Sequence, residues 1–257
     1  LTNEAPTFHH EDGKFSGHGV EILRLVAKKI PGYDHKLYSV GNYARLAQQI
    51  EKGPSTCGIA LFKTEARRKV MLFSDVPSFY FFNIQLVMNR TTFEKYGEPQ
   101  SLSLEDVLKD PQNVLGLSKG RTYAKELRKI ITGHDGTNIT TIAQGNTSKS
   151  LSQMVAGGRI TFTFAYPGET AWISHNLGER ADLVTVPISE INTLSHAFIA
   201  CSKGTQGEKI IAQINASLAI QRPTAAYRKQ LESWLTPNLV PLFRKNYAEV
   251  FLNIAGS

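Results

Sequence analysis

Hydrophobic positions along this chain follow two spacings, one typical of strands and one typical of helices. Short apolar runs predict strands at residues 36–40, 56–62, 114–117, 138–143, 160–165, 184–186 and 195–202, and an aromatic-rich run predicts another at 79–88. Helical spacing predicts helices at residues 20–30, 43–52, 64–70, 122–132, 147–156, 169–177, 206–221 and 224–235, and residues 237–254 are amphipathic. Strands that alternate with helices predict an α/β fold with parallel sheets.

Turn residues mark the boundaries of these elements. Asp12-Gly13, between Phe8 and Phe15, predicts a small hairpin. Pro31-Gly32 and Gly53-Pro54 each end a predicted helix. In α/β folds, ligands bind where strands end and helices begin. The turns at residues 62–67, 118–123 and 165–170 are therefore the predicted binding segments.

The segment from Gly58 to Asp75 carries the clearest chemical signal. A buried strand is followed by Thr64, a good helix N-cap, and then by Arg67 in the first helical turn. Free N–H groups and an arginine fork at one point favour an anion, most naturally a carboxylate. The alternative is an exposed basic face, because Arg67-Arg68-Lys69 is a run of charges.

Composition narrows the class of protein. The chain has 257 residues, is 41% hydrophobic and 20% charged, and carries a net charge of +7. The positive charge is spread thinly, so we expect no nucleic-acid partner. No apolar run is long enough to span a membrane. The sequence begins with Leu1 rather than with an initiator Met, so we expect a mature chain from which a signal peptide has been cleaved.

Motifs for catalysis, metals and cofactors are missing from the sequence. It contains no P-loop, no Gly-x-Gly-x-x-Gly after a strand and no Gly-x-Ser-x-Gly elbow. His9-His10-Glu11 is the one histidine cluster, and adjacent residues of an extended segment point to opposite faces. We therefore expect no metal and no cofactor. The two cysteines, Cys57 and Cys201, suit either reduced thiols or one disulfide.

Several segments in register resemble the type II periplasmic solute-binding proteins, specifically the amino-acid-binding branch of family 3 of the ABC importers. The resemblance covers about residues 5–235. It rests on Glu11–Gly17, Tyr43–Gly53, Thr64–Asp75, Leu115–Leu117 with Gly120–Thr122, Ala156–Ile160 and Ala226–Trp234. The resemblance implies a two-lobed α/β fold with two crossover strands that closes on a ligand. Lobe 1 would contain residues 1–87 and 195–257, and lobe 2 residues 88–194.

The resemblance also implies roles for individual residues. Arg67 matches the family's carboxylate-binding arginine, Thr64 and Thr122 match hydroxyls that bind the same group, and Tyr43 matches an aromatic that stacks on the ligand. Phe62 would add apolar cover, and Arg121, Tyr123 and Tyr166 would face the ligand from lobe 2. Cys57 and Cys201 would lie on neighbouring strands of lobe 1, which favours a disulfide over two thiols.

One departure from the family pattern bears on the ligand. Tyr166 stands where the family has the Asp that holds an amino group, and a phenol cannot neutralise an ammonium ion. Glu169 or Glu4 would have to substitute, unless both are simply solvated carboxylates.

The main hypothesis is a periplasmic, monomeric binding protein. It would deliver a small anionic or zwitterionic ligand to the membrane permease of an ABC importer, without catalysis. The alternative is the ligand-sensing module of a membrane receptor, which the long segment 237–254 would suit. A lesser alternative is an enzyme on the same fold, with Glu4 or Glu169 as its carboxylate.

Overall fold

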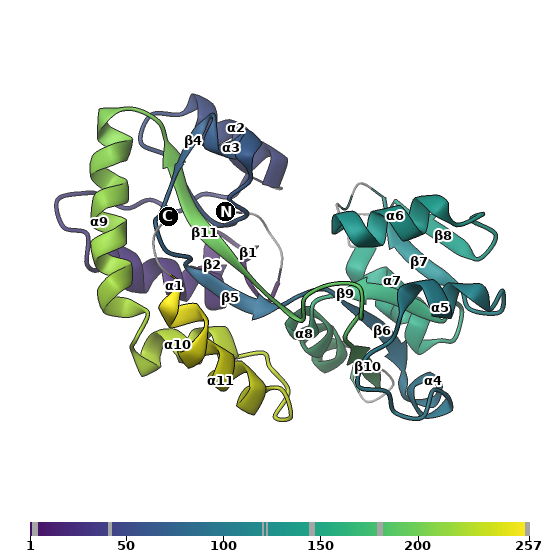
Figure 1. Ribbon diagram of the computed structural model, residues 1–257. Helices are drawn as coiled ribbons and strands as arrows, with labels where there is room; N and C mark the ends of the chain where they lie inside the picture. The colour runs from purple at the N-terminus through teal and green to yellow at the C-terminus, as the bar shows by residue number, and fades with distance from the viewer. Residues whose placement is uncertain are drawn as a thin grey trace. The chain divides into compact units, whose positions relative to one another are not determined.

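The chain folds into two compact units, each described here by itself. The computed structural model describes residues 1, 5–40, 43–119, 121, 123–143, 147–178 and 182–254 (Figure 1). Unit 1 contains Leu1–Phe81 and His196–Ser257, and unit 2 contains Phe82–Ser195. The polypeptide therefore begins unit 1, builds all of unit 2 and then returns to unit 1.

Unit 1 contains strands and helices from both ends of the chain. Its N-terminal elements are β1 (His9–Glu11), β2 (Lys14–Ser16), α1 (His18–Ala27), α2 (Tyr43–Lys52), β3 (Cys57–Leu61), α3 (Glu65–Arg68), β4 (Met71–Phe73) and β5 (Phe79–Phe82). Its C-terminal elements are β11 (Leu194–Ser202), α9 (Thr205–Gln221), α10 (Ala225–Glu232), α11 (Val240–Glu249) and the 3-10 turn η1 (Phe251–Asn253).

The predicted hairpin at Asp12-Gly13 is confirmed. Strands β1 and β2 pair antiparallel, with His9 opposite Ser16 and Glu11 opposite Lys14. Asp12 has φ of 48° and Gly13 has φ of 75°. Two consecutive residues with positive φ form the tight turn whose twist matches that of the strands, which explains the Asp-Gly pair.

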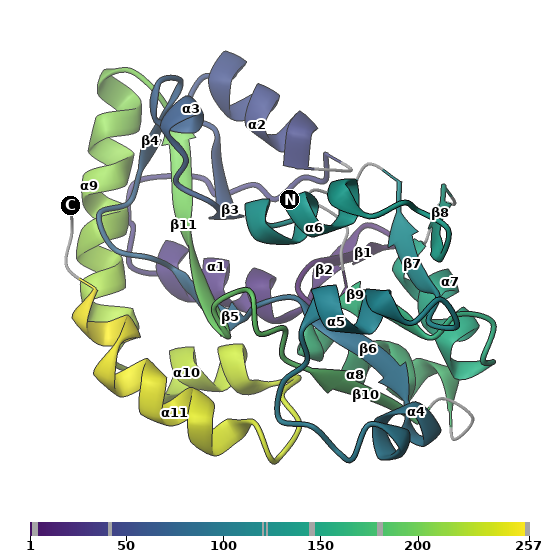
Figure 2. The same ribbon diagram turned by 45° about the vertical axis from the view of Figure 1, so that its right-hand side comes forward.

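The returning strand β11 occupies the centre of the main sheet of unit 1. The strand order is β3-β11-β4, and β5 also pairs with β11. Both β3 and β4 run antiparallel to β11, so this sheet is not parallel as the alternation of elements predicted. The reason is that β11 enters from unit 2 rather than through a helix of unit 1. Figure 2 shows β4 and β11 between α9 and α2.

A disulfide joins β11 to β3. Cys57 and Cys201 lie directly opposite each other in the ladder and are bonded, at a sequence separation of 144. The predicted pairing is therefore confirmed. Cys201 is fully buried, whereas Cys57 is exposed at the start of β3.

Unit 2 has a sheet with helices on both faces. Its elements are β6 (Gln85–Asn89), α4 (Arg90–Lys95), α5 (Leu104–Lys109), β7 (Leu115–Ser118), α6 (Lys125–Gly133), β8 (Ile139–Ile142), α7 (Thr147–Ala156), β9 (Phe162–Ala165), α8 (Pro167–Leu177) and β10 (Leu183–Val186). The strand order is β10-β6-β9-β7-β8. Strand β7 runs parallel to β8 and β9, whereas β6 runs antiparallel to β9 and β10.

Two hydrophobic clusters cover the two faces of this sheet. One contains Leu104 and Leu127 from α5 and α6, and the other contains Leu151 and Val155 from α7. Helix α7 lies very close to β7, since a Cβ at Gly116 would be 2.6 Å from Leu151 and 2.5 Å from Ile160. Glycine at position 116 therefore permits the helix to pack against the strand.

Two sequence-based predictions differ from the observed elements. Residues 36–40 form no strand and are mostly exposed, although the Val40 N–H donates to the Leu1 carbonyl. The aromatic run 79–88 is divided into β5 and β6 by Asn83, whose N–H donates to the Thr193 carbonyl and whose side chain accepts from the Ile84 N–H. A hydrophobicity pattern cannot reveal this interruption, because the residues on both sides are apolar.

The C-terminal segment packs on β5. Phe243 and Phe251 are completely buried, and their rings lie 5.8 and 5.2 Å from the ring of Tyr80. The amphipathic pattern at 237–254 is therefore explained by packing within unit 1, and α11 covers its middle part.

We expect the disulfide to stabilise unit 1 substantially. Closing so long a loop removes entropy from the unfolded chain, so a Cys57→Ser/Cys201→Ser variant should lose about 2–5 kcal/mol of unfolding free energy. Urea unfolding of both proteins measures this. Adding a reductant should destabilise the wild-type protein and leave the variant unchanged; equal stability of the two proteins would contradict the expectation.

The environment of His18 predicts a loss of stability in mild acid. Burial lowers the pKa of His18 to about 4, although its hydrogen bond to the Pro6 carbonyl opposes this shift. The unfolded chain therefore binds a proton below pH 6.5 that the folded chain does not bind. This should reduce the unfolding free energy by about 2 kcal/mol between pH 7 and pH 5. In urea unfolding at a series of pH values, His18→Gln should flatten the dependence of the unfolding free energy on pH between pH 7 and pH 5. An unchanged slope in the variant would exclude His18 as the cause of this dependence.

Candidate functional site

In unit 1, the predicted carboxylate-binding segment has the local structure that its sequence suggests. Thr64 caps α3, and its hydroxyl accepts a hydrogen bond from the Arg67 N–H at 3.3 Å. This cap stops the chain from extending β3 and turns it into a helix at Glu65. Arg67 therefore lies three residues after the cap, in the first turn of α3.

The Arg67 side chain folds back toward the end of β3. Its guanidinium donates to the Phe62 carbonyl at 3.2 Å, and the residue is half-buried. The neighbouring Arg68 and Lys69 are exposed. Arg67 therefore differs from the rest of its charge run, because its guanidinium is held beside the carboxyl end of the strand.

A β-bulge precedes this turn. Ala200 pairs with Gly58 and Phe198 pairs with Leu61, so Ile59 and Ala60 together oppose a single residue of β11. Ala60 has φ of 61°, which is strained for a residue with a side chain. Beyond the bulge Leu61 is completely buried, whereas Phe62 is 45% exposed and lies 6.3 Å from the ring of Phe81. Bulges are frequent beside functional sites, where they redirect side chains.

In unit 2, the predicted residues Glu169 and Tyr166 both contact Arg121. Its guanidinium lies 3.3 Å from the Glu169 carboxylate and 5.5 Å from the centre of the Tyr166 ring. The side chains of Arg121 and Glu169 are 21% and 19% exposed. Partial burial makes this pair stronger than a solvated one. Glu169, in the same unit, thus forms an ion pair with Arg121 and balances its positive charge.

The pKa of Arg121 reflects this pairing. Burial lowers the pKa of Arg121, but the charge and hydrogen bond of Glu169, together with the nearby Tyr166 and Tyr123, outweigh burial and the net shift is upward. Arg121 therefore stays charged at every physiological pH.

Glu169 is positioned by the start of α8. Pro167 occupies the first helical turn, and the Glu169 carboxylate also accepts from the Tyr166 N–H at 3.4 Å. This is the carboxylate half of a capping box, in which an acidic residue at the third helical position reaches back to the cap. Glu169 therefore caps α8 and pairs with Arg121 at the same time, and it is not a solvated carboxylate.

Tyr123 closes the turn that follows β7. Its hydroxyl accepts a hydrogen bond from the Ser118 N–H at 3.2 Å, and its ring lies 5.1 Å from that of Phe164. Burial raises the pKa of the Tyr123 hydroxyl. The phenol therefore remains neutral and acts as a hydrogen-bonding group.

Sequence analysis missed Ser148. Its hydroxyl lies 3.3 Å from the Arg121 guanidinium, in the first turn of α7. The signal was present, because helix α7 is the next element after strand β8, the same strand-to-helix order as at the three turns that were singled out. Arg121 thus contacts the first turns of two helices, α7 and α8.

Glu4 and Thr122 lie outside the described residues, and so does the side chain of Tyr43, the first residue of α2. Across the part of the chain that is described, no three His, Cys, Asp or Glu side chains gather as a metal site requires. Within the same residues, no helix combines the length and the hydrophobicity needed to cross a bilayer.

Solved structures with the same fold include amino-acid-binding proteins and a histidine kinase sensor domain. An ancestral arginine-binding protein bound to arginine has a TM-score of 0.64 and 20% identity, over 91% of this chain and 95% of that one. A periplasmic binding protein of Salmonella typhimurium with high arginine specificity has a TM-score of 0.59 and 17% identity, over 91% and 96%. A histidine kinase sensor domain with similarity to periplasmic binding proteins has a TM-score of 0.64 and 18% identity, over 91% and 94%.

These likenesses confirm the predicted two-lobed, type II α/β fold. No curated protein sequence matches the chain. A family model, however, matches residues 2–237, which is most of the sequence. That family and its structural neighbours are binding proteins. The chain therefore belongs to the bacterial extracellular solute-binding proteins, family 3.

Proposed function

We propose that this protein captures a small carboxylate-bearing or zwitterionic solute in a cleft between its lobes and delivers it to an ABC importer. The observation that carries the proposal is the Arg67 guanidinium, held at the carboxyl end of β3 by the Phe62 carbonyl. Two of the similar structures, an ancestral protein and one from Salmonella typhimurium, bind arginine. The type of ligand proposed here is correspondingly small and polar.

The carboxylate of the solute would pair with Arg67. A guanidinium offers a planar fork of donors that matches two carboxylate oxygens. Thr64 would add its hydroxyl, and the exposed ring of Phe62 would cover an apolar part of the solute. Thr122 and Tyr43 complete this proposed set by their resemblance to the family.

Unit 2 supports a solute that also carries a positive charge. Tyr166 cannot neutralise an ammonium ion, but Glu169 lies three residues away and is already oriented by the Tyr166 N–H. Arg121 lies 3.3 Å from the Glu169 carboxylate and orients it, and the remaining oxygen lone pairs of this carboxylate would accept the ammonium group. We therefore propose Glu169 as the partner of the solute's ammonium group, with Arg121, Tyr123 and Tyr166 around it. Glu4 is the other carboxylate that the sequence offers.

The proposed cellular setting follows from the family. The protein would act as a monomer outside the cytoplasmic membrane, in the periplasm, after removal of a signal peptide. Its partner would be the permease of an ABC importer. Hinge closure of the two lobes would exclude water from the solute and create the surface that the permease recognises.

A sensory role is the second candidate, because a histidine kinase sensor domain shares this fold. In that role the solute would bind in the same way, but closure would be transmitted through a membrane anchor. The neighbouring genes separate the two roles: permease and ATPase genes indicate import, and a continuous reading frame into a kinase indicates sensing.

Removing the Arg67 guanidinium should weaken solute binding strongly. A thermal-shift screen of amino acids, organic acids, opines and small peptides first identifies a solute, since a bound ligand raises the melting temperature. Arg67→Ala should then lower its affinity at least tenfold in calorimetry, because a charge-assisted pair is lost.

Arg68→Ala is the matched control, because Arg68 is adjacent, equally charged and exposed. It should leave the affinity within about twofold of the wild type, as expected for a screened surface charge. A dissociation constant unaffected by Arg67→Ala would remove Arg67 from the site.

Glu169→Gln tests the proposed ammonium partner. For an amine-bearing solute we expect at least a tenfold loss of affinity, and for its deaminated analogue a much smaller change. The variant should also lose about 1–3 kcal/mol of stability, because Arg121 is left without its carboxylate. Glu126→Gln, the same change at an exposed residue in the first turn of α6, is the control. Equal losses for both solutes would show that Glu169 does not contact the ammonium group.

A further inference from the structure

A buried arginine of unit 1 lies far in sequence from every residue proposed for the solute site. Arg222, at the C-terminal end of α9, is 5% exposed. Its guanidinium donates to the Phe251 carbonyl and lies 4.3 Å from the centre of the Phe251 ring. Its buried Nε has no hydrogen-bond partner. Among the described residues, no carboxylate forms an ion pair with it.

An unpaired buried cation is costly, and structures normally avoid it. Burial lowers the pKa of Arg222, which shows how poorly its surroundings replace water. The Phe251 carbonyl and ring offset part of this cost, but neither carries a negative charge. A bound anion would supply both the missing charge and the missing acceptor.

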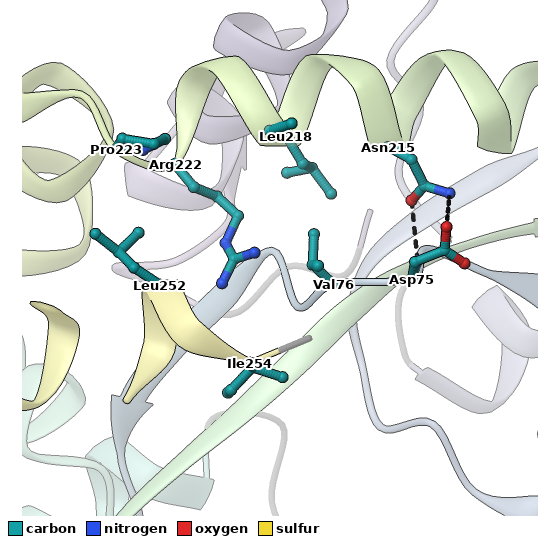
Figure 3. Close-up of a pocket in the computed structure, with 9 residues that line it drawn as sticks. Asp75, Val76, Asn215, Leu218, Arg222, Pro223, Leu252 and Ile254 are labelled. Carbon is teal, nitrogen blue, oxygen red and sulfur yellow. Dashed lines mark hydrogen bonds between the residues drawn. The ribbon is translucent and has the colours of Figure 1, made fainter. Parts of the chain in front are cut away.

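The guanidinium borders a pocket of about 450 Å³. Figure 3 shows it directed between Leu252, Val76 and Ile254. Most of the lining is aliphatic, with Leu218 and Ala219 of α9 on one side. The volume lies within the range of pockets that hold small organic ligands. A largely apolar pocket with one cation at its end suits a ligand with an apolar body and an anionic head.

Asp75 limits the charge of such a ligand. It lies across the pocket from Arg222, and its carboxylate accepts from the Asn215 amide at 2.7 Å (Figure 3). A ligand with a second carboxylate at its far end would approach this negative charge. The pocket therefore favours one carboxylate and disfavours two.

The C-terminal segment contributes lining residues that lie outside the family match. The family model ends at residue 237, whereas Phe251, Leu252 and Ile254 come after it. The pocket also lies entirely within unit 1, and none of its residues belongs to the proposed solute site. It is therefore independent of that site.

We infer that the pocket between α9, the loop after β4 and the C-terminal segment binds a short aliphatic monocarboxylate, whose carboxylate pairs with Arg222. The ligand would neutralise the buried guanidinium and fill the apolar space beside it. By contacting both α9 and Leu252, it would also fasten the C-terminal segment to the rest of unit 1.

Methyl NMR titration with hexanoate tests this inference. Saturable shifts are expected at Val76, Leu252 and Ile254. Hexan-1-ol and hexylammonium should bind with at most a tenth of the affinity of hexanoate. Adipate should also bind more weakly than hexanoate. Arg67→Ala should leave the titration unchanged, which separates this pocket from the proposed solute site.

Ala219→Phe should weaken hexanoate binding at least tenfold by filling the pocket. Ala216→Phe, at an exposed position of the same helix outside the pocket, should leave it unchanged. Both variants keep Arg222, so neither removes the contacts that hold the C-terminal segment. The inference is overturned if wild-type protein shows no saturable shifts, if hexan-1-ol binds as well as hexanoate, or if binding survives Ala219→Phe.

Discussion

The antiparallel pairing of β11 with β3 and β4 is the constraint on which the rest of unit 1 depends. The first 81 residues supply only the outer strands of the sheet, and the returning strand supplies its centre. Six of the nine residues of β11 are buried, as expected for a strand with neighbours on both sides. The Cys57–Cys201 bond fixes the same pairing covalently at one end of the ladder.

The position of Arg67 follows from that pairing. The bulge at Ala60 exists only because β3 is paired with β11, and it determines that Leu61 points into the core and Phe62 away from it. The chain then turns at Thr64 into α3, and the Arg67 side chain reaches back to the end of the strand. A long-range contact between the two ends of the chain thus orients a local motif.

Much of the fold was predictable because hydrophobic spacing and turn residues are local signals. The Asp12-Gly13 hairpin and the helices around residues 43–52 and 147–156 were read from such signals. The direction of the strands was not, since periodicity describes one strand at a time and cannot reveal that β11 enters the sheet from unit 2. The break at Asn83 was also invisible, because it depends on a hydrogen bond to Thr193.

The residues around Arg121 in unit 2 also separate what is predictable from local sequence from what is not. The turns that contain Arg121 and Glu169 could be identified from their positions after strands. Their pairing could not, because the two residues are 48 positions apart and nothing in the sequence links them. Ser148 lies in the first turn of α7, the helix that follows β8, and was overlooked. Local rules therefore select segments, whereas ion pairs within a site require the folded chain.

The insertion of unit 2 into unit 1 has a consequence for biosynthesis. Translation delivers Phe82–Ser195 before most of β11, so all of the chain of unit 2 is available while the sheet of unit 1 still lacks its central strand. During that interval β3 and β4 present unsatisfied backbone groups, and Cys57 has no partner. A nascent chain that stalls before residue 194 would therefore be incomplete, prone to aggregation and a substrate for chaperones.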